Sequence, residues 1–269
     1  MKHSAKLNII REWKFESDKK HRLAVVIILT AILFEMTGCT GFTSATRPTE
    51  YPAPPAAADL KSAEKGWWYA RFKISWPENT EPKWHIDTIL AHRVVEPVLE
   101  RYRDMITLWR FHRRAARDNA GHRFSFIFYS TPAIADQVFD SLERNRELKL
   151  MRDNDLINDA IYDNTGIIAK PGIGDTSDKN WTENIQKTWP YFIMGASRMW
   201  LHMIDGLSSQ TAGQMDVMSV EELQQHYRII HDYINLQWLE QGNHAILHHI
   251  NALFGYQPVY VYEKRKMNF

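Results

Sequence analysis

The segment Arg123–Ser130 constrains the fold more strongly than any other part of the chain. Its sequence, RFSFIFYS, places Phe124, Phe126 and Phe128 on one side of an extended backbone and the remaining side chains on the other. Alternation of this kind indicates a β-strand with one buried face. Because three phenylalanines on one face need a second layer to cover them, the segment predicts a sheet with helices packed on one side.

The flanking segments predict the other elements of that sheet. Helical spacing runs from His85 to Ile106 with a kink or break expected at Pro97, and Thr131 followed by Pro132 is typical of a helix start. Asp118–Gly121 has the composition of a turn. Further strands are predicted at Trp67–Ile74, Leu108–Arg114 and, as a short fourth strand, Leu148–Met151. The order βαββαβ predicts an α+β fold with a ferredoxin-like antiparallel sheet.

The second half of the chain is predicted to be mostly helical. Residues 153–179 have the polar composition of a loop with one short helical piece, and Trp181–Gly206 is predicted as a helix interrupted near Pro190. Ser219 to Glu222 forms a capping box that opens a helix to about Gln241. A further helix is predicted at Asn243–Phe254, and a terminal strand at Pro258–Glu263.

An apolar segment near the start of the chain predicts export from the cell. Leu23–Phe34 is uncharged, follows the basic run Lys19–Arg22, and leads into Thr37-Gly38-Cys39, which holds the only cysteine. A helix of this length spans about 18 Å, less than the roughly 30 Å of a bilayer core. The pattern is typical of a removed secretory signal, and its ending resembles the lipobox of bacterial lipoproteins, in which the cysteine is lipidated. The long lead and Glu35 favour instead an uncleaved signal anchor, and a cytoplasmic protein is the third alternative.

The lipoprotein interpretation divides the chain into three parts. Residues 1–38 are the signal peptide, residues 39–66 are a Pro- and Ala-rich tether, and residues 67–269 are the globular domain, with a ferredoxin-like part at 67–152 and a helical part at 153–269. The acyl groups on Cys39 would hold the protein on a membrane of the bacterial envelope. Thr40, which stands where known lipoproteins retained in the inner membrane have Asp, predicts the outer membrane, facing the periplasm.

Composition narrows the class of protein further. With 33 Lys and Arg, 32 Asp and Glu, and a formal net charge of +1, the chain lacks the basic excess typical of nucleic-acid binders. The sole cysteine excludes an internal disulfide, so stability must come from packing. Aromatic residues supply the area for it, with 10 Trp, 11 Tyr and 12 Phe.

Three motifs carry a resemblance to a known family. They are Trp67-Trp68-Tyr69 at the first strand, the pair Trp109–Arg114 and Gly121–Phe126, and His248–Gly255 late in the chain. These motifs resemble the C-terminal elimination domain of class I lantibiotic dehydratases and the stand-alone thiopeptide-type bacteriocin biosynthesis proteins. That family eliminates glutamyl groups from modified Ser or Thr at a site rich in arginine with a histidine. The resemblance therefore implies Arg113, with His248 or His249, as the matching positions.

This sequence departs from the family at the charged positions. Phe124 and Phe126 stand where the family has strand arginines, and Ala252 replaces the arginine of its Asn-Arg-Leu motif. A carboxylate leaving group needs cationic partners, which phenylalanine and alanine cannot provide. Export is a second objection, because the family's chemistry belongs to the cytoplasm. The resemblance thus implies a shared scaffold that has lost its catalytic charges.

Two other groups of residues are candidate sites. Arginines on the predicted hairpin, with His112 and His122 beside them, would form a pocket for an anion or a carboxylate, or else a solvated hairpin paired with acids such as Asp118. The hairpin arginines are Arg110, Arg113, Arg114, Arg117 and Arg123. His244 and His248 share helical spacing with Glu240 across Gly242, but a usual third ligand is missing, so neither a metal nor a cofactor is predicted.

The leading hypothesis is an envelope lipoprotein that acts as a non-catalytic binding or accessory module for another envelope protein or a peptide. The alternative is an enzyme, either a lyase like the family or a hydrolase using Arg113, His122 and His248. A structural spacer is the third hypothesis, favoured if no cleft of ligand size exists.

Overall fold

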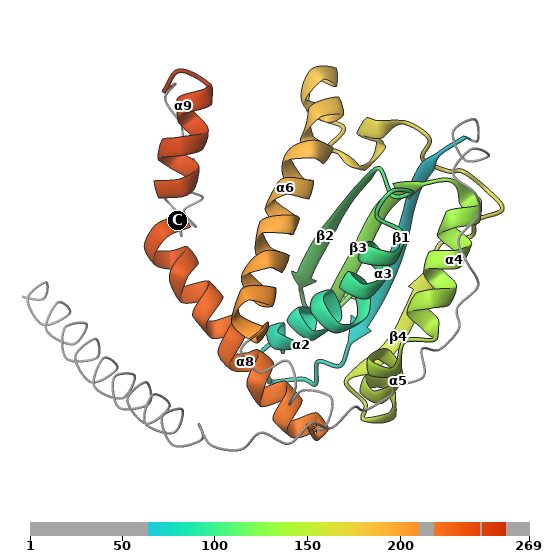
Figure 1. Cartoon of the computed structure of the whole chain (residues 1–269), viewed down its shortest axis with the longest axis vertical. Helices are drawn as coiled ribbons and strands as arrows, with labels where there is room; N and C mark the ends of the chain where they lie inside the picture. Colours follow the sequence, from blue (N-terminus) through green and yellow to red (C-terminus); the bar gives the residue numbers. More distant parts are fainter. Residues whose placement is uncertain (1–63, 210–217, 243, 257–269) are drawn as a thin grey trace, which may run out of the picture. The chain divides into compact units, whose positions relative to one another are not determined.

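A computed structural model describes residues 64–209, 218–242 and 244–256 (Figure 1). Its sheet has four antiparallel strands in the order β2-β3-β1-β4, with β1 at Gly66–Ile74, β2 at Leu108–Ala115, β3 at His122–Ser130 and β4 at Ile157–Tyr162. The predicted α+β class is confirmed, and the half that follows β4 is mostly helical.

One helical run connects β1 to β2, as predicted. It consists of α2 (Trp84–Ile89), the π-helical segment η1 (Leu90–Val95) and α3 (Glu96–Arg101). Pro97 lies in the first turn of α3, so the irregularity predicted at this proline is the π segment immediately before it. A proline is tolerated in a first turn because its missing N–H has no partner to lose there.

The prediction of a fourth strand at Leu148–Met151 is wrong. These residues lie in α5 (Arg146–Asp153), which follows α4 (Pro132–Glu143), and the fourth strand is β4, in a segment predicted as a loop. Asn145 starts α5, because its side-chain oxygen accepts hydrogen bonds from the backbone N–H of Glu147 and Leu148. Leu148 and Met151 are three apart on one buried helical face. The sheet therefore extends past the boundary predicted at residue 152.

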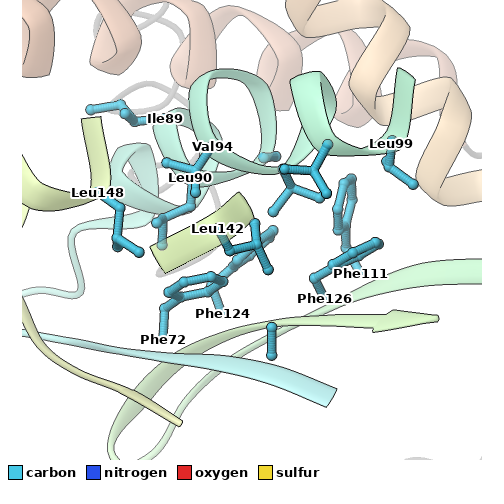
Figure 2. Close-up of a cluster of buried hydrophobic side chains, with 14 of the residues drawn as sticks. Phe72, Ile89, Leu90, Val94, Leu99, Phe111, Phe124, Phe126, Leu142 and Leu148 are labelled. Atoms are coloured by element: carbon cyan, nitrogen blue, oxygen red, sulfur yellow. The ribbon is translucent and has the colours of Figure 1, made fainter. Parts of the chain in front are cut away.

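The main core lies between the sheet and the helices that connect its strands. Phe72, Phe124 and Phe126 point from the strands toward Leu90 and Leu142 on the helices (Figure 2). All five side chains are fully buried. The face predicted to carry the three phenylalanines of Arg123–Ser130 is thus confirmed as the inner face of the sheet.

The long helix α6 (Glu183–Ser208) runs through Pro190 without the predicted interruption. A proline inside a helix leaves the carbonyl four residues earlier without its N–H donor. Here that carbonyl belongs to Gln186, and it accepts a hydrogen bond from the Ser177 hydroxyl at 2.7 Å. The missing donor is replaced from the preceding loop, which also contains the short 3₁₀ helix η2 (Ile173–Thr176).

The helix α6 also covers the edge of the sheet. The backbone N–H of Phe111 in the edge strand β2 donates to Ser197 Oγ of α6 at 3.1 Å. An edge strand with free N–H groups is a site of unwanted pairing, and a helix laid along it removes that hazard.

The remaining helices follow as one series: α8 (Val220–Gln237), the π segments η4 (Trp238–Gly242) and η5 (His244–Ile250), and α9 (Asn251–Leu253). The capping box predicted at Ser219 and Glu222 is confirmed, with both reciprocal hydrogen bonds present.

Several predictions fall outside the described residues. They concern the signal peptide, Cys39, nearly all of the tether, and the strand at Pro258–Glu263. Among the helices that the structure describes, none combines the length and the apolar character needed to span a bilayer.

Candidate functional site

The outer face of the sheet gathers basic side chains from three strands. Strand alternation turns the odd-numbered residues of β1 and β3 away from the helices, and the register aligns them with the even-numbered residues of β2. One row across the sheet is Lys73–Arg123–Arg114, and the next is Arg71–Ser125–His112. We call Arg71, Lys73, His112, Arg114 and Arg123 the basic face.

The charges of the basic face are only partly neutralised. Arg71 pairs at 2.7 Å with Asp163, directly after β4, and Arg114 pairs at 2.6 Å with Asp118, between β2 and β3. Lys73 lies opposite Asp159 of β4. At the centre, Arg123 has Lys73 on one side and Arg114 on the other, and its Nε is buried without a hydrogen-bond partner among the described residues. Like charges directly opposite in a sheet are destabilising, so the row Lys73–Arg123–Arg114 favours binding of an anion, which would offset the repulsion.

The pKa of His112, on the basic face, is affected by burial and by the arginines near it. Burial lowers the pKa of its imidazole, and the neighbouring Arg110 and Arg114 lower it further. The imidazole therefore stays neutral at neutral pH, and the positive charge of this face comes from the arginines and the lysine.

The opposite end of the outer face is closed by the loop before α6. The Trp67 indole donates to the carbonyls of Gly172 and Ile173, and the Tyr129 hydroxyl donates to that of Pro171 at 2.6 Å. Arg110 donates to the carbonyl of Thr176 at 3.2 Å, and burial lowers the pKa of its guanidinium. Arg110, predicted to bind a ligand, thus holds this loop against the sheet.

Arg113 faces the inner side of the sheet, because it is one residue out of phase with Arg110 and Arg114. Its guanidinium donates to Asp87 Oδ2 at 3.2 Å and to the carbonyl of Trp84 at 3.0 Å, and it lies over the rings of Trp84 and Trp200. Asp87 is fully buried. His122 Nε2 also lies 3.2 Å from Asp87 Oδ2, within reach of N–H donation to the carboxylate.

Arg113 and His122, both predicted as catalytic candidates, are therefore neighbours. They meet at the buried carboxylate of Asp87, which sequence analysis did not identify as a site residue. Arg113 and His122 both contact the carboxylate of Asp87, and these contacts link α2 to the hairpin β2–β3. Asp87 Oδ1 and His122 Nδ1 are buried without hydrogen-bond partners among the described residues. The only sequence signal for Asp87 is an acidic residue in an otherwise apolar helix face.

The other candidates have different neighbours. His248 and His249 lie in η5, where their rings contact each other at 5.0 Å between centroids and also contact His244, while His248 contacts Tyr256 as well. Within the part of the chain that the structure describes, no group of three or more possible ligands is arranged to hold a metal. Ala252 is exposed in α9.

Phe124 and Phe126, which replace arginines in the family resemblance, are fully buried in the inner core. Comparisons with protein-family models, with curated proteins and with solved structures found no match to this chain.

Proposed function

We propose that this protein is a lipid-anchored binding module of the bacterial envelope, and that its basic face holds an acidic segment of a partner protein. The observation that carries the proposal is the row Lys73–Arg123–Arg114, in which three cations stand directly opposite one another on adjacent strands. An acidic segment lying across these strands would replace repulsion with charge-assisted hydrogen bonds.

The scaffold belongs to the same proposal. Its element order and its strand order, 2-3-1-4, are those expected of a ferredoxin-like sheet, which supports that finer assignment. Where the resemblance to elimination domains implies strand arginines, Phe124 and Phe126 fill the core, and Arg113 is bound to Asp87. These contacts favour a binding module over a lyase, because they leave the leaving group without its cations.

A direct binding measurement tests the basic face. The probe is a short peptide of alternating Glu and Gly, titrated into the full chain in detergent at low salt. Changing both Lys73→Gln and Arg123→Gln should weaken binding by about tenfold, since two cations are lost. The matched control is Arg146→Gln with Lys149→Gln on the exposed face of α5, which removes the same charge elsewhere and should leave binding unchanged.

Equal weakening in the two double variants would contradict the assignment, because the effect would then come from net charge alone. Vesicles containing phosphatidylglycerol test a competing occupant. Binding to these vesicles that is lost in the basic-face variant, without binding to the acidic peptide, would show that a membrane rather than a protein covers this face.

The anchor is tested separately. Metabolic labelling with a radioactive fatty acid should mark the wild-type protein and leave Cys39→Ser unlabelled. Fractionation should then place the wild type with the outer membrane. Labelling of both forms, or of neither, would contradict lipidation at Cys39 and leave the test of the basic face intact.

A further inference from the structure

A concave site lies between α3 and α6, away from the basic face. Its volume is about 620 Å³, within the range of roughly 300–1,000 Å³ that is typical of small-molecule sites. Leu99, Trp109 and Leu201 contribute apolar surface, while Glu96, Arg198 and Asp205 contribute charged groups. The cavity is separate from the basic face, because Leu99, Trp109 and Leu201 belong to the core on the inner side of the sheet.

At one end of the cavity, the lining residues Glu96 and Asp205 both lie close to His92. Its Nε2 lies 3.4 Å from Glu96 Oε2, 3.9 Å from Asp205 Oδ1 and 3.2 Å from Ser208 Oγ. Its Nδ1 lies 2.5 Å from the Tyr227 hydroxyl on α8. Four helical segments therefore fix the imidazole and the two carboxylates relative to each other: η1 with His92, α3 with Glu96, α6 with Asp205 and α8 with Tyr227.

His92 does not supply a positive charge to the two carboxylates. Burial lowers its pKa to about 4, and Arg93 and His226 oppose its protonation as well. Burial also raises the pKa of the Tyr227 hydroxyl, so that hydroxyl keeps its proton and donates it to Nδ1. The imidazole is then neutral with its proton on Nε2, directed toward Glu96 and Ser208.

Among the described residues, only the neutral His92 lies within ion-pair distance of Glu96 or Asp205. Burial raises the pKa of Glu96 to about 7, and the charges of Asp205 and Glu100 contribute to the shift. Arg103 pairs with Glu100, and Arg93 pairs with Glu147 on α5. Arg198 lines the cavity without an ion pair to either carboxylate among the described residues.

We propose that this cavity is a binding site for an organic ammonium ion, with its charged group between Glu96 and Asp205 and its apolar body against Leu99, Trp109 and Leu201. An ammonium group donates three hydrogen bonds and would satisfy both carboxylates at once. The apolar lining accounts for the rest of the ligand, since burial of hydrocarbon supplies most of the affinity in such sites.

The test uses two probes that share a phenylethyl body and carry head groups of opposite charge, 2-phenylethylammonium and 3-phenylpropionate. Each is titrated into the full chain in detergent by isothermal titration calorimetry at pH 8, where Glu96 is ionised. We expect the ammonium probe to bind and the carboxylate probe to bind at least about tenfold more weakly. Equal or tighter binding of the carboxylate would overturn the proposal and assign the cavity to Arg198.

Two isosteric variants test the residues. Glu96→Gln and Asp205→Asn should each weaken the ammonium probe by about tenfold or more, because each removes one charge without changing the shape of the cavity. Asp232→Asn on the exposed side of α8 makes the same chemical change outside the cavity and should have no effect. Unchanged affinity in both cavity variants would overturn the proposal, and circular dichroism of each variant distinguishes this result from a loss of fold.

Discussion

The two faces of the sheet are built from alternate residues of the same strands, yet they have opposite character. On the inner face, Phe72, Phe124 and Phe126 are 0% exposed and pack on the connecting helices. On the outer face, their chain neighbours Lys73 and Arg123 remain partly exposed. One segment of chain therefore supplies both the core and the charged surface, because successive side chains of a strand point to opposite sides.

The two faces should contribute differently to stability. Apolar burial on the inner side is expected to supply the free energy of folding, while the outer side keeps a row of like charges that folding alone would disfavour. The exception on the inner side is the group of Arg113, Asp87 and His122, in which charge is buried but paired. Mutations on each face should therefore change different measured quantities.

The largest effect is expected from the centre of the inner face. Phe126→Ala should lower the free energy of unfolding by about 3–5 kcal/mol, because it leaves a cavity in a fully buried site. Urea denaturation of the full chain in detergent, followed by circular dichroism, measures the change. The control Phe192→Ala, on the exposed side of α6, should cost less than about 1 kcal/mol. Similar losses in the two variants would contradict the assigned inner core.

The buried ion pair should give the next largest effect. Asp87→Ala leaves the Arg113 guanidinium without its carboxylate and should lower the free energy of unfolding by about 3 kcal/mol. The double variant Asp87→Ala with Arg113→Met should recover part of that loss, because no unpaired charge then remains. A double variant less stable than Asp87→Ala alone would show that Arg113 contributes mainly by its stacking on Trp84 and Trp200.

The elements that could be predicted from the sequence are those with local signals. The alternation of Arg123–Ser130, the capping residue Thr131 and the capping box at Ser219 each depend on residues close in the chain, and each is confirmed. The prediction of the fourth strand failed because Asn158 and Asp159 interrupt the apolar residues of β4, and its pairing with β1 joins residues far apart in the chain. Leu148–Met151 looks equally apolar, but Asn145 makes it helical.

For the candidate site, too, local sequence patterns were predictable and contacts between distant residues were not. The sequence indicated an arginine-rich hairpin, but alternation alone separates Arg113 from Arg114, and only the sheet register brings Lys73 beside Arg123. The group around Asp87 joins a helix to two strands, and the cavity at Glu96 and Asp205 joins two helices, in both cases from segments distant in sequence. No spacing pattern connects these residues, so sequence analysis could not place them together.

A smaller effect is expected on how the free energy of unfolding depends on pH, and it comes from buried histidines. Burial is the main cause that lowers the pKa of His85, His92 and His231 to about 4, from an ordinary value near 6.5. Between these two values the unfolded chain binds more protons than the folded chain, so the free energy of unfolding should fall as the pH is lowered from about 6.5 to 4. Burial also lowers the pKa of His112 and His226, which act in the same direction, whereas Glu96, with its pKa raised to about 7, acts in the opposite direction.

Urea midpoints at pH 7, 5.5 and 4.5 measure this dependence. His231→Gln should reduce the slope, since it removes one of the buried histidines. Midpoints that rise steadily toward pH 4.5 would show that Glu96 and other carboxyl groups dominate, and that the buried histidines are not held neutral.

The smallest effect on stability is expected at the centre of the basic face. Arg123→Gln should change the free energy of unfolding by no more than about 0.5 kcal/mol, because it removes a partly exposed charge that repels Lys73 and Arg114. A change toward higher stability is the favoured direction, since the repulsion by Lys73 and Arg114 is relieved. A loss above about 2 kcal/mol would show that Arg123 supports the fold, and the outer face would then resemble the inner one in its contribution to stability.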